Sequence, residues 1–303
     1  IIKICLQLWH RSKGAYEDLR ESGFLKLPSG RLLRYYKNSV DSSSGLNQQK
    51  LKWMAKEAKD KGVTDYGRHG AIIFDEMSIQ EDIELKQKNG QWEIVGITRM
   101  GESAHQLLAL TKGAVQSTMA THMLQFMFLG NEGFRFPFAH FPTANVTSAQ
   151  LFELFWDAVD ALQMFGFTVR LSISDGAGAN RKFVLMHFKD TKEAEDNKYT
   201  TISPASGKSL TFMMDPSHNF KKVRNGVEKS KANHSGARQF TIGDTEILWD
   251  HLYAAYLYDL EHNSLQTHRF LTDEHFHLTS TSKMRNHLAD DVLGEDMLNL
   301  LKV

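Results

Sequence analysis

Three short apolar runs in this sequence each end at an aspartate. They cover residues 70–75, 168–175 and 210–215, and their last residues are Asp75, Asp175 and Asp215. Short runs rich in β-branched and aromatic residues favour buried strands. Helical patterns follow the second and third runs, one after a glycine-rich turn and one after a proline. This alternation predicts a mixed α/β sheet with helices on its faces.

Two further strands and three helices are predicted from the rest of the sequence. Residues 92–98 and 119–129 are apolar enough for two more strands. Apolar residues at helical spacing predict helices over 51–61, 249–262 and from Ser148 through Phe165, where Ser148 is the expected N-cap. The expected order is three strands, helix, strand, helix, strand, helix.

The first 40 residues predict a small helical unit. Residues 1–23 have helical spacing, and a second short helix over 31–36 follows a turn in which Ser29 can act as cap. Residues 1–37 hold eight Lys or Arg against three acids, although the whole chain has zero net charge. A helix-turn-helix would present Arg31, Arg34 and Lys37 to DNA phosphates. A helical hairpin that only packs on the core fits the pattern equally well.

Composition excludes several classes of protein. Cys5 is the single cysteine, which excludes a disulfide framework and a cysteine-based zinc module within these residues. No apolar run approaches the roughly 20 residues of a membrane span, so no membrane partner is expected. The chain begins at Ile1, and we expect it to be part of a longer protein.

The aspartates at strand ends suggest metal chemistry. A carboxylate buried at the end of a strand is unfavourable unless a cation, a hydrogen bond or water compensates for it. Asp75 and Asp175, on strands that could be neighbours, would suit hard cations such as Mg²⁺ or Mn²⁺, and two such ions support phosphodiester cleavage. A single aspartate after a strand is more often a turn residue or helix cap, and Asp215 before Pro216 is typical of an N-cap. Glu76 would lie on the opposite face of its strand.

Three other motifs carry weaker signals. Residues 206–209, Ser-Gly-Lys-Ser, lack the earlier glycine and the preceding strand of a phosphate-binding loop. His275-Phe276-His277 has no third ligand at metal spacing, so we expect these histidines at the surface. His218 could meet the acids, but a surface or capping position is the simpler interpretation.

Four segments together resemble the P-element and THAP-type DNA transposases. They are residues 1–40, notably Tyr16–Arg20 and Leu27-Pro28-Ser29, then Phe74–Ile79, Ser174-Asp175-Gly176 with Asn180, and Asp215–Asn225, which is similar to the family's Asp-Pro-x-His-x-x-Lys-x-x-Arg-Asn signature. The resemblance implies an RNase H-like, retroviral-integrase-like core with a DDE triad, in which Asp75 and Asp175 are the first two metal ligands. It implies a helix-turn-helix at 1–40, a linker and helix at 41–66, the core at 67–225, and the start of an insertion domain at 226–303.

The resemblance also implies partners and activity. The insertion domain binds GTP in the P element itself, and Lys283-Met284 resembles the family's lysine-methionine patch, but no guanine-specifying motif assigns GTP contacts here. We expect DNA, as transposon ends and target, to be the partner of a homo-oligomer in the nucleus. The third acid, a glutamate, lies after the insertion in the family, so this chain alone is expected to be inactive. A domesticated DNA-binding or interaction protein that keeps the fold without turnover is the alternative, and an unrelated nuclease of the same fold fits less well.

Overall fold

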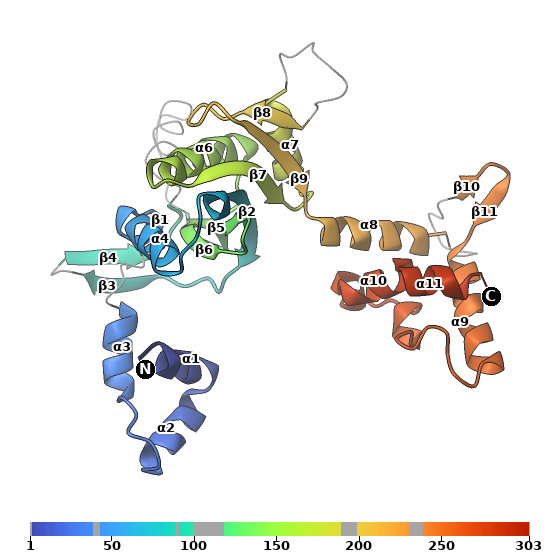
Figure 1. Cartoon of the computed structure of the whole chain (residues 1–303), viewed down its shortest axis with the longest axis horizontal. Helices are drawn as coiled ribbons and strands as arrows, with labels where there is room; N and C mark the ends of the chain where they lie inside the picture. The colour runs from blue at the N-terminus through green and yellow to red at the C-terminus, as the bar shows by residue number, and fades with distance from the viewer. Residues whose placement is uncertain are drawn as a thin grey trace. The chain divides into compact units, whose positions relative to one another are not determined.

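The computed structural model describes residues 2–38, 43–88, 91–99, 118–188, 199–230 and 239–302. The chain divides into two compact units (Figure 1). Unit 1 comprises Ile1–Ser172 and Lys182–Thr211, and unit 2 comprises Ile173–Arg181 and Phe212–Val303.

Unit 1 begins with three helices, which Figure 1 draws in shades of blue: α1 (Ile2–Arg11), α2 (Lys13–Glu21) and α3 (Gly30–Asn38). The single helical run expected over 1–23 is therefore two helices. Ser12 separates them because its side chain accepts a hydrogen bond from Ala15 N and caps α2. A small core holds the three helices together, formed by Cys5, Trp9, Tyr16 and Leu33.

The expected mixed α/β, RNase H-like sheet is confirmed. Seven strands lie in the order β1-β6-β5-β2-β7-β9-β8. Their bounds are Gly45–Leu46 (β1), Arg135–Thr143 (β6), His122–Gly130 (β5), His69–Ser78 (β2), Thr168–Ser174 (β7), Ser209–Met214 (β9) and Thr200–Ile202 (β8). α4 (Gln48–Asp60) precedes the long strands, and α6 (Ser148–Met164) and α7 (Gly178–Met186) flank β7 in sequence, as Figure 1 shows.

Aromatic side chains form the core between the sheet and its helices. Phe74 of β2 stacks on Phe126 of β5 at 5.3 Å between ring centroids. The same ring contacts Phe155 of α6 at 6.2 Å and Phe183 of α7 at 5.9 Å. α6 and α7 therefore cover the face of the sheet that carries Phe74.

One predicted strand lies outside the main sheet, and one long strand of the main sheet was not predicted. Residues 92–98 do not join the main sheet: β4 (Gln91–Val95) pairs with β3 (Glu84–Lys88) in a separate hairpin. β6 was missed because Pro137 and Pro142 interrupt its apolar pattern, and proline is unfavourable inside a sheet. The structure accommodates them near an edge, where only the two-residue β1 lies beyond β6, and the register shifts opposite Pro137.

The N-cap of α6 also differs from the prediction. Thr147, rather than Ser148, caps the helix, and its side chain and Gln150 form a reciprocal capping box. An N-cap residue needs an extended backbone, which Thr147 adopts at φ −85° and ψ 158°. Ser148 is already the first residue of the helix, so its hydroxyl does not cap it.

Unit 2 is mainly helical from Pro216 onward. It contains α8 (Pro216–Glu228), the hairpin of β10 (Phe240–Ile242) and β11 (Thr245–Ile247), α9 (Trp249–His262), α10 (His287–Leu293) and α11 (Glu295–Leu300). The predicted helix over 249–262 is confirmed. The hydrophobic core of unit 2 is formed by Trp249, Tyr256, Leu271, Phe276, Val292, Met297 and Leu300.

The expected surface position of His275 was wrong. His275 lies in the short helical turn η3 (Asp273–His275) and is only 3% exposed. Its Nδ1 accepts a hydrogen bond from Thr272 N at 3.0 Å, and its Nε2 lies 3.1 Å from Asp291 Oδ2. Both ring nitrogens thus have partners inside the unit, so this histidine is part of the packed structure. No helix in the described part of the chain is long and apolar enough to cross a membrane.

Candidate active site

Asp175 follows β7 directly and precedes the first turn of α7, as the sequence predicted. The residue is half-buried. Its carboxylate Oδ1 accepts hydrogen bonds from Asn180 Nδ2 at 2.6 Å and from Ala177 N at 2.9 Å. Oδ2 makes no hydrogen bond to any residue in the described ranges. The carboxylate is therefore oriented by α7 while one oxygen stays open to a ligand.

Asp215 caps α8 in the predicted way. Its backbone N–H donates to Ser174 O at 2.8 Å, which ties the ends of β9 and β7 together. Its Oδ1 accepts from Ser217 N at 2.9 Å, and its Oδ2 lies 2.6 Å from His218 Nδ1. Burial alone would raise the pKa of Asp215, but the hydrogen bonds from His218 and Ser217 outweigh it and lower that pKa. Both carboxylate oxygens serve the helix start, and His218 is the capping partner rather than part of a larger acidic group.

Asp75 lies inside its strand rather than at its end, which corrects the prediction. β2 continues to Ser78, and Asp75 pairs with Gln125 of β5. The Asp75 side chain is exposed, and its Oδ1 accepts from Glu76 N at 2.9 Å. Glu76 points to the other face, where Thr143 Oγ1 donates to it at 2.7 Å. In the sheet order, β2 is the neighbour of β7.

Asp175 fits the chemistry of a divalent cation. Its open, oriented carboxylate oxygen is the hard ligand type that Mg²⁺ and Mn²⁺ prefer. Within the ranges that the structure describes, no three His, Cys, Asp or Glu side chains gather as a ready metal cluster.

The predicted DNA-contacting residues lie on α3. Arg31 and Arg34 are exposed, while Leu33 faces inward and is fully buried. Arg34 Nε donates to Gly30 O of the same helix at 3.3 Å. Lys37 belongs to α3, but its side chain lies outside the described residues. The helix thus presents Arg31 and Arg34 to solvent.

The phosphate-loop interpretation of residues 206–209 is excluded by their structure. Residues 206–208 lie in the turn of the antiparallel hairpin between β8 and β9, Ser209 is the first residue of β9, and Gly207 has φ +65°. No helix follows this turn, whereas a phosphate-binding loop connects a strand to a helix.

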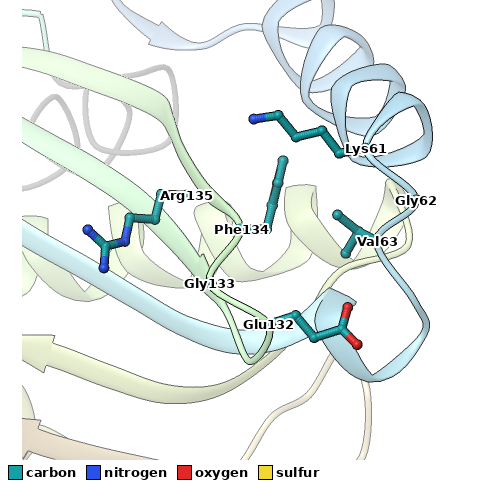
Figure 2. A pocket seen from close by; sticks show the side chains of 7 residues that line it. All are labelled: Lys61, Gly62, Val63, Glu132, Gly133, Phe134 and Arg135. Atoms are coloured by element: carbon teal, nitrogen blue, oxygen red, sulfur yellow. The ribbon is translucent and has the colours of Figure 1, made fainter.

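An open hollow, whose lining side chains Figure 2 shows, lies near the start of β2, at the opposite end of that strand from Asp75. It lies where the loop after α4 meets the β5–β6 turn, and its volume is about 490 Å³. Lys61 Nζ lies 5.7 Å from the centre of the Phe134 ring, and Glu132 accepts from Thr64 Oγ1 at 2.7 Å. These contacts tie the two loops together.

Residues 42–186 match the family described as TNP-like, RNase H N-terminal domain. The fold is similar to that of a solved Drosophila P element transposase strand transfer complex, with a TM-score of 0.69 and 18% sequence identity. That alignment covers 99% of this chain and 57% of the transposase chain, so this chain spans little more than half the length of its structural relative. No curated protein matches the chain.

Proposed function

We propose that this chain, whose domain match and fold support a P-element-type transposase family, is the part of a DNA transposase that cleaves and joins phosphodiesters. The observation that carries the proposal is the oriented carboxylate of Asp175 at the end of β7, next to the strand that bears Asp75. The solved relative was captured as a strand transfer complex, which supports DNA as the partner.

In this proposal Asp75 and Asp175 hold Mg²⁺ or Mn²⁺. Bound divalent ions would activate the attacking oxygen and stabilise the leaving oxygen of the phosphodiester. The chain's own contribution is orientation: Asn180 and Ala177 fix the Asp175 carboxylate. Glu76 is the poorer candidate because Thr143 engages it on the opposite face of β2.

The other residues would hold DNA. Arg31, Arg34 and Lys37 on α3 would contact phosphates, which position a duplex without reading its sequence. The third acidic ligand in the family is a glutamate, and we assign that role to no residue of this chain.

Further features of the family are proposed on resemblance. The helical part of unit 2 would be the start of the insertion domain, with GTP as its ligand. The protein would act on DNA in the nucleus as a homo-oligomer.

A Mn²⁺ titration of the chain, followed by electron paramagnetic resonance, tests the metal site. We expect saturable binding that is lost in Asp175→Asn and Asp75→Asn and retained in Glu76→Gln, the matched change on the opposite face. In the full-length protein, Asp175→Asn should abolish metal-dependent strand cleavage and leave DNA binding intact.

The outcomes separate the candidate functions. Wild-type Mn²⁺ affinity or cleavage in Asp175→Asn would remove Asp175 from the mechanism. DNA binding without any Mn²⁺ binding by the wild-type chain would favour a domesticated DNA-binding protein.

A further inference from the structure

Lys222 places its ammonium group against the backbone next to Asp175. Lys222 lies on α8, and Gly176 is the buried residue that follows Asp175. A methyl group added at Gly176 would collide with Lys222 Nζ, and it would lie 3.4 Å from Met214 Sδ. The lysine therefore reaches back from its helix to the ends of β7 and β9.

The absence of a side chain at position 176 is what permits this approach. Gly176 does not have a φ in the left-handed region, unlike eight other glycines in the described part of the chain. Backbone conformation therefore does not require glycine here. The space that a β-carbon would take is occupied instead by the Lys222 ammonium.

No ion pair to the Lys222 ammonium is formed by a carboxylate in the part of the chain that the structure describes. The ammonium also makes no hydrogen bond with any residue in the described ranges. Both oxygens of Asp215 are engaged by Ser217 and His218, whereas Asp175 is engaged by Asn180 and Ala177 through Oδ1 only and its Oδ2 stays open. The Lys222 side chain is exposed to solvent, so its strongly hydrated ammonium is accessible to an anionic ligand.

We propose that Lys222 binds a phosphate of the DNA strand that is held at Asp175. The inference rests on the proposed function and adds a substrate contact to the same site. A lysine ammonium is a compact point charge that binds phosphate oxygens without demanding one geometry. At this position it offsets the repulsion between the Asp175 carboxylate and an incoming phosphodiester, both of which are anionic.

The proposed contact between Lys222 and a DNA phosphate can be tested with two different substitutions. Lys222→Met removes the charge, whereas Gly176→Ala keeps the charge and displaces the ammonium. Lys221→Met is the matched control, since it makes the same change one residue earlier on the same helix.

The experiment measures binding of the 303-residue chain to a mixed-sequence DNA duplex by fluorescence anisotropy, in Ca²⁺, over a series of salt concentrations. We expect Lys222→Met and Gly176→Ala each to weaken binding several-fold and to lower the slope of log affinity against log salt by about one. Lys221→Met should leave that slope unchanged. The double variant should bind no more weakly than Lys222→Met, because both changes remove one contact.

A parallel Mn²⁺ titration separates phosphate binding from support of Asp175. Lys222→Met should bind Mn²⁺ at least as tightly as wild type, because it removes a cation beside a metal ligand. Weaker Mn²⁺ binding, an unchanged salt slope, or equal losses in Lys221→Met and Lys222→Met would overturn the assignment while leaving the proposed metal site intact. A wild-type chain that binds no DNA would overturn the proposed function and this inference together.

Discussion

Asn180 holds Asp175 through a hydrogen bond of 2.6 Å from its amide Nδ2 to the carboxylate Oδ1. The two residues are five positions apart, so the first turns of α7 orient the acid that ends β7. Ala177 N donates to the same oxygen at 2.9 Å. The carboxylate plane is thereby set by local structure, before any metal or DNA is bound.

Asn180→Ala should weaken Mn²⁺ binding without unfolding the protein. Loss of a residue that orients a metal ligand lowers affinity by roughly ten-fold or more. The measurement is the Mn²⁺ titration described above, with thermal unfolding as the check on the fold. Arg181→Ala, an exposed change at the next position, is the control and should have no effect. Equal affinities for Asn180→Ala and wild type would mean that Asp175 is held well enough by Ala177 alone.

The acids at the ends of β7 and β9 could be predicted because their signals are local. Asp175 and Asp215 each stand between an apolar run and a helix start, and Pro216 marks that start for α8. Asp75 also ends an apolar run, but no helix start follows it to mark the end of its strand. Its strand continues through polar residues to Ser78 because β5 pairs along its whole length, and the partner strand is about 50 residues away in sequence.

Long-range contacts explain the remaining differences. The local sequence predicts a surface position for His275, but Asp291 and the surrounding core residues, which are distant in sequence, bury it. Lys222 and Gly176 are 46 positions apart, and the sequence around neither residue predicts that they lie close together. β6 shows the opposite case, in which local proline signals argue against a strand that its neighbours nevertheless impose.

His187 should make unit 1 less stable in mild acid. Its Nε2 accepts from Trp156 Nε1 at 3.1 Å, and its Nδ1 lies 3.0 Å from Phe183 O, which requires the neutral ring with the proton on Nδ1. Burial lowers the pKa of His187, and the backbone hydrogen bonds to Val184 and Phe183 oppose this only in part.

The direction of this pH dependence follows from the difference in the pKa of His187 between the folded and the unfolded chain. The folded pKa lies below the unfolded value of about 6.5, so the unfolded chain takes up the proton first as pH falls. The stability that the neutral ring contributes is complete above about pH 6.5 and declines below it. Urea unfolding between pH 8 and pH 5 should show a smaller decline for His187→Phe than for wild type. Parallel pH profiles for the two proteins would show that His187 does not titrate differently in the folded state.

Asp215→Ala should destabilise the start of α8 without removing the metal site. Loss of an N-cap side chain lowers the free energy of unfolding by about 1 kcal/mol. Asp215→Asn retains an oxygen for Ser217 N and should lose less. Chemical unfolding gives the stabilities, and the Mn²⁺ titration should give wild-type affinity for both variants. Loss of Mn²⁺ binding in both would show that Asp215 is itself a metal ligand.

Arg224 should be the residue of α8 to which the stability of unit 2 is most sensitive. Its side chain is fully buried, and its Nη2 donates to Lys283 O at 3.0 Å and to Ser282 O at 3.4 Å. Burial lowers the pKa of Arg224, and the charge of Glu228 opposes that change. Lys283 Nζ in turn lies 3.0 Å from the buried Glu228 Oε2. α8 is therefore fastened to the turn η4 (Ser282–Met284) by a guanidinium and an ion pair.

Arg224→Ala removes the donor from two backbone carbonyls and leaves a cavity beside Glu228. Each unsatisfied buried polar group costs about 1–3 kcal/mol, so we expect a loss of roughly 3 kcal/mol. Arg224→Lys should recover little of it, because an ammonium cannot reproduce the planar fork of the guanidinium. Native-state hydrogen exchange of the amides of unit 2 measures this loss of stability, and Val223→Ala at a position 55% exposed is the control on the same helix. A change within about 0.5 kcal/mol for Arg224→Ala, as expected of an ordinary surface substitution, would mean that the bonds from Arg224 to Ser282 and Lys283 do not hold the helix in place.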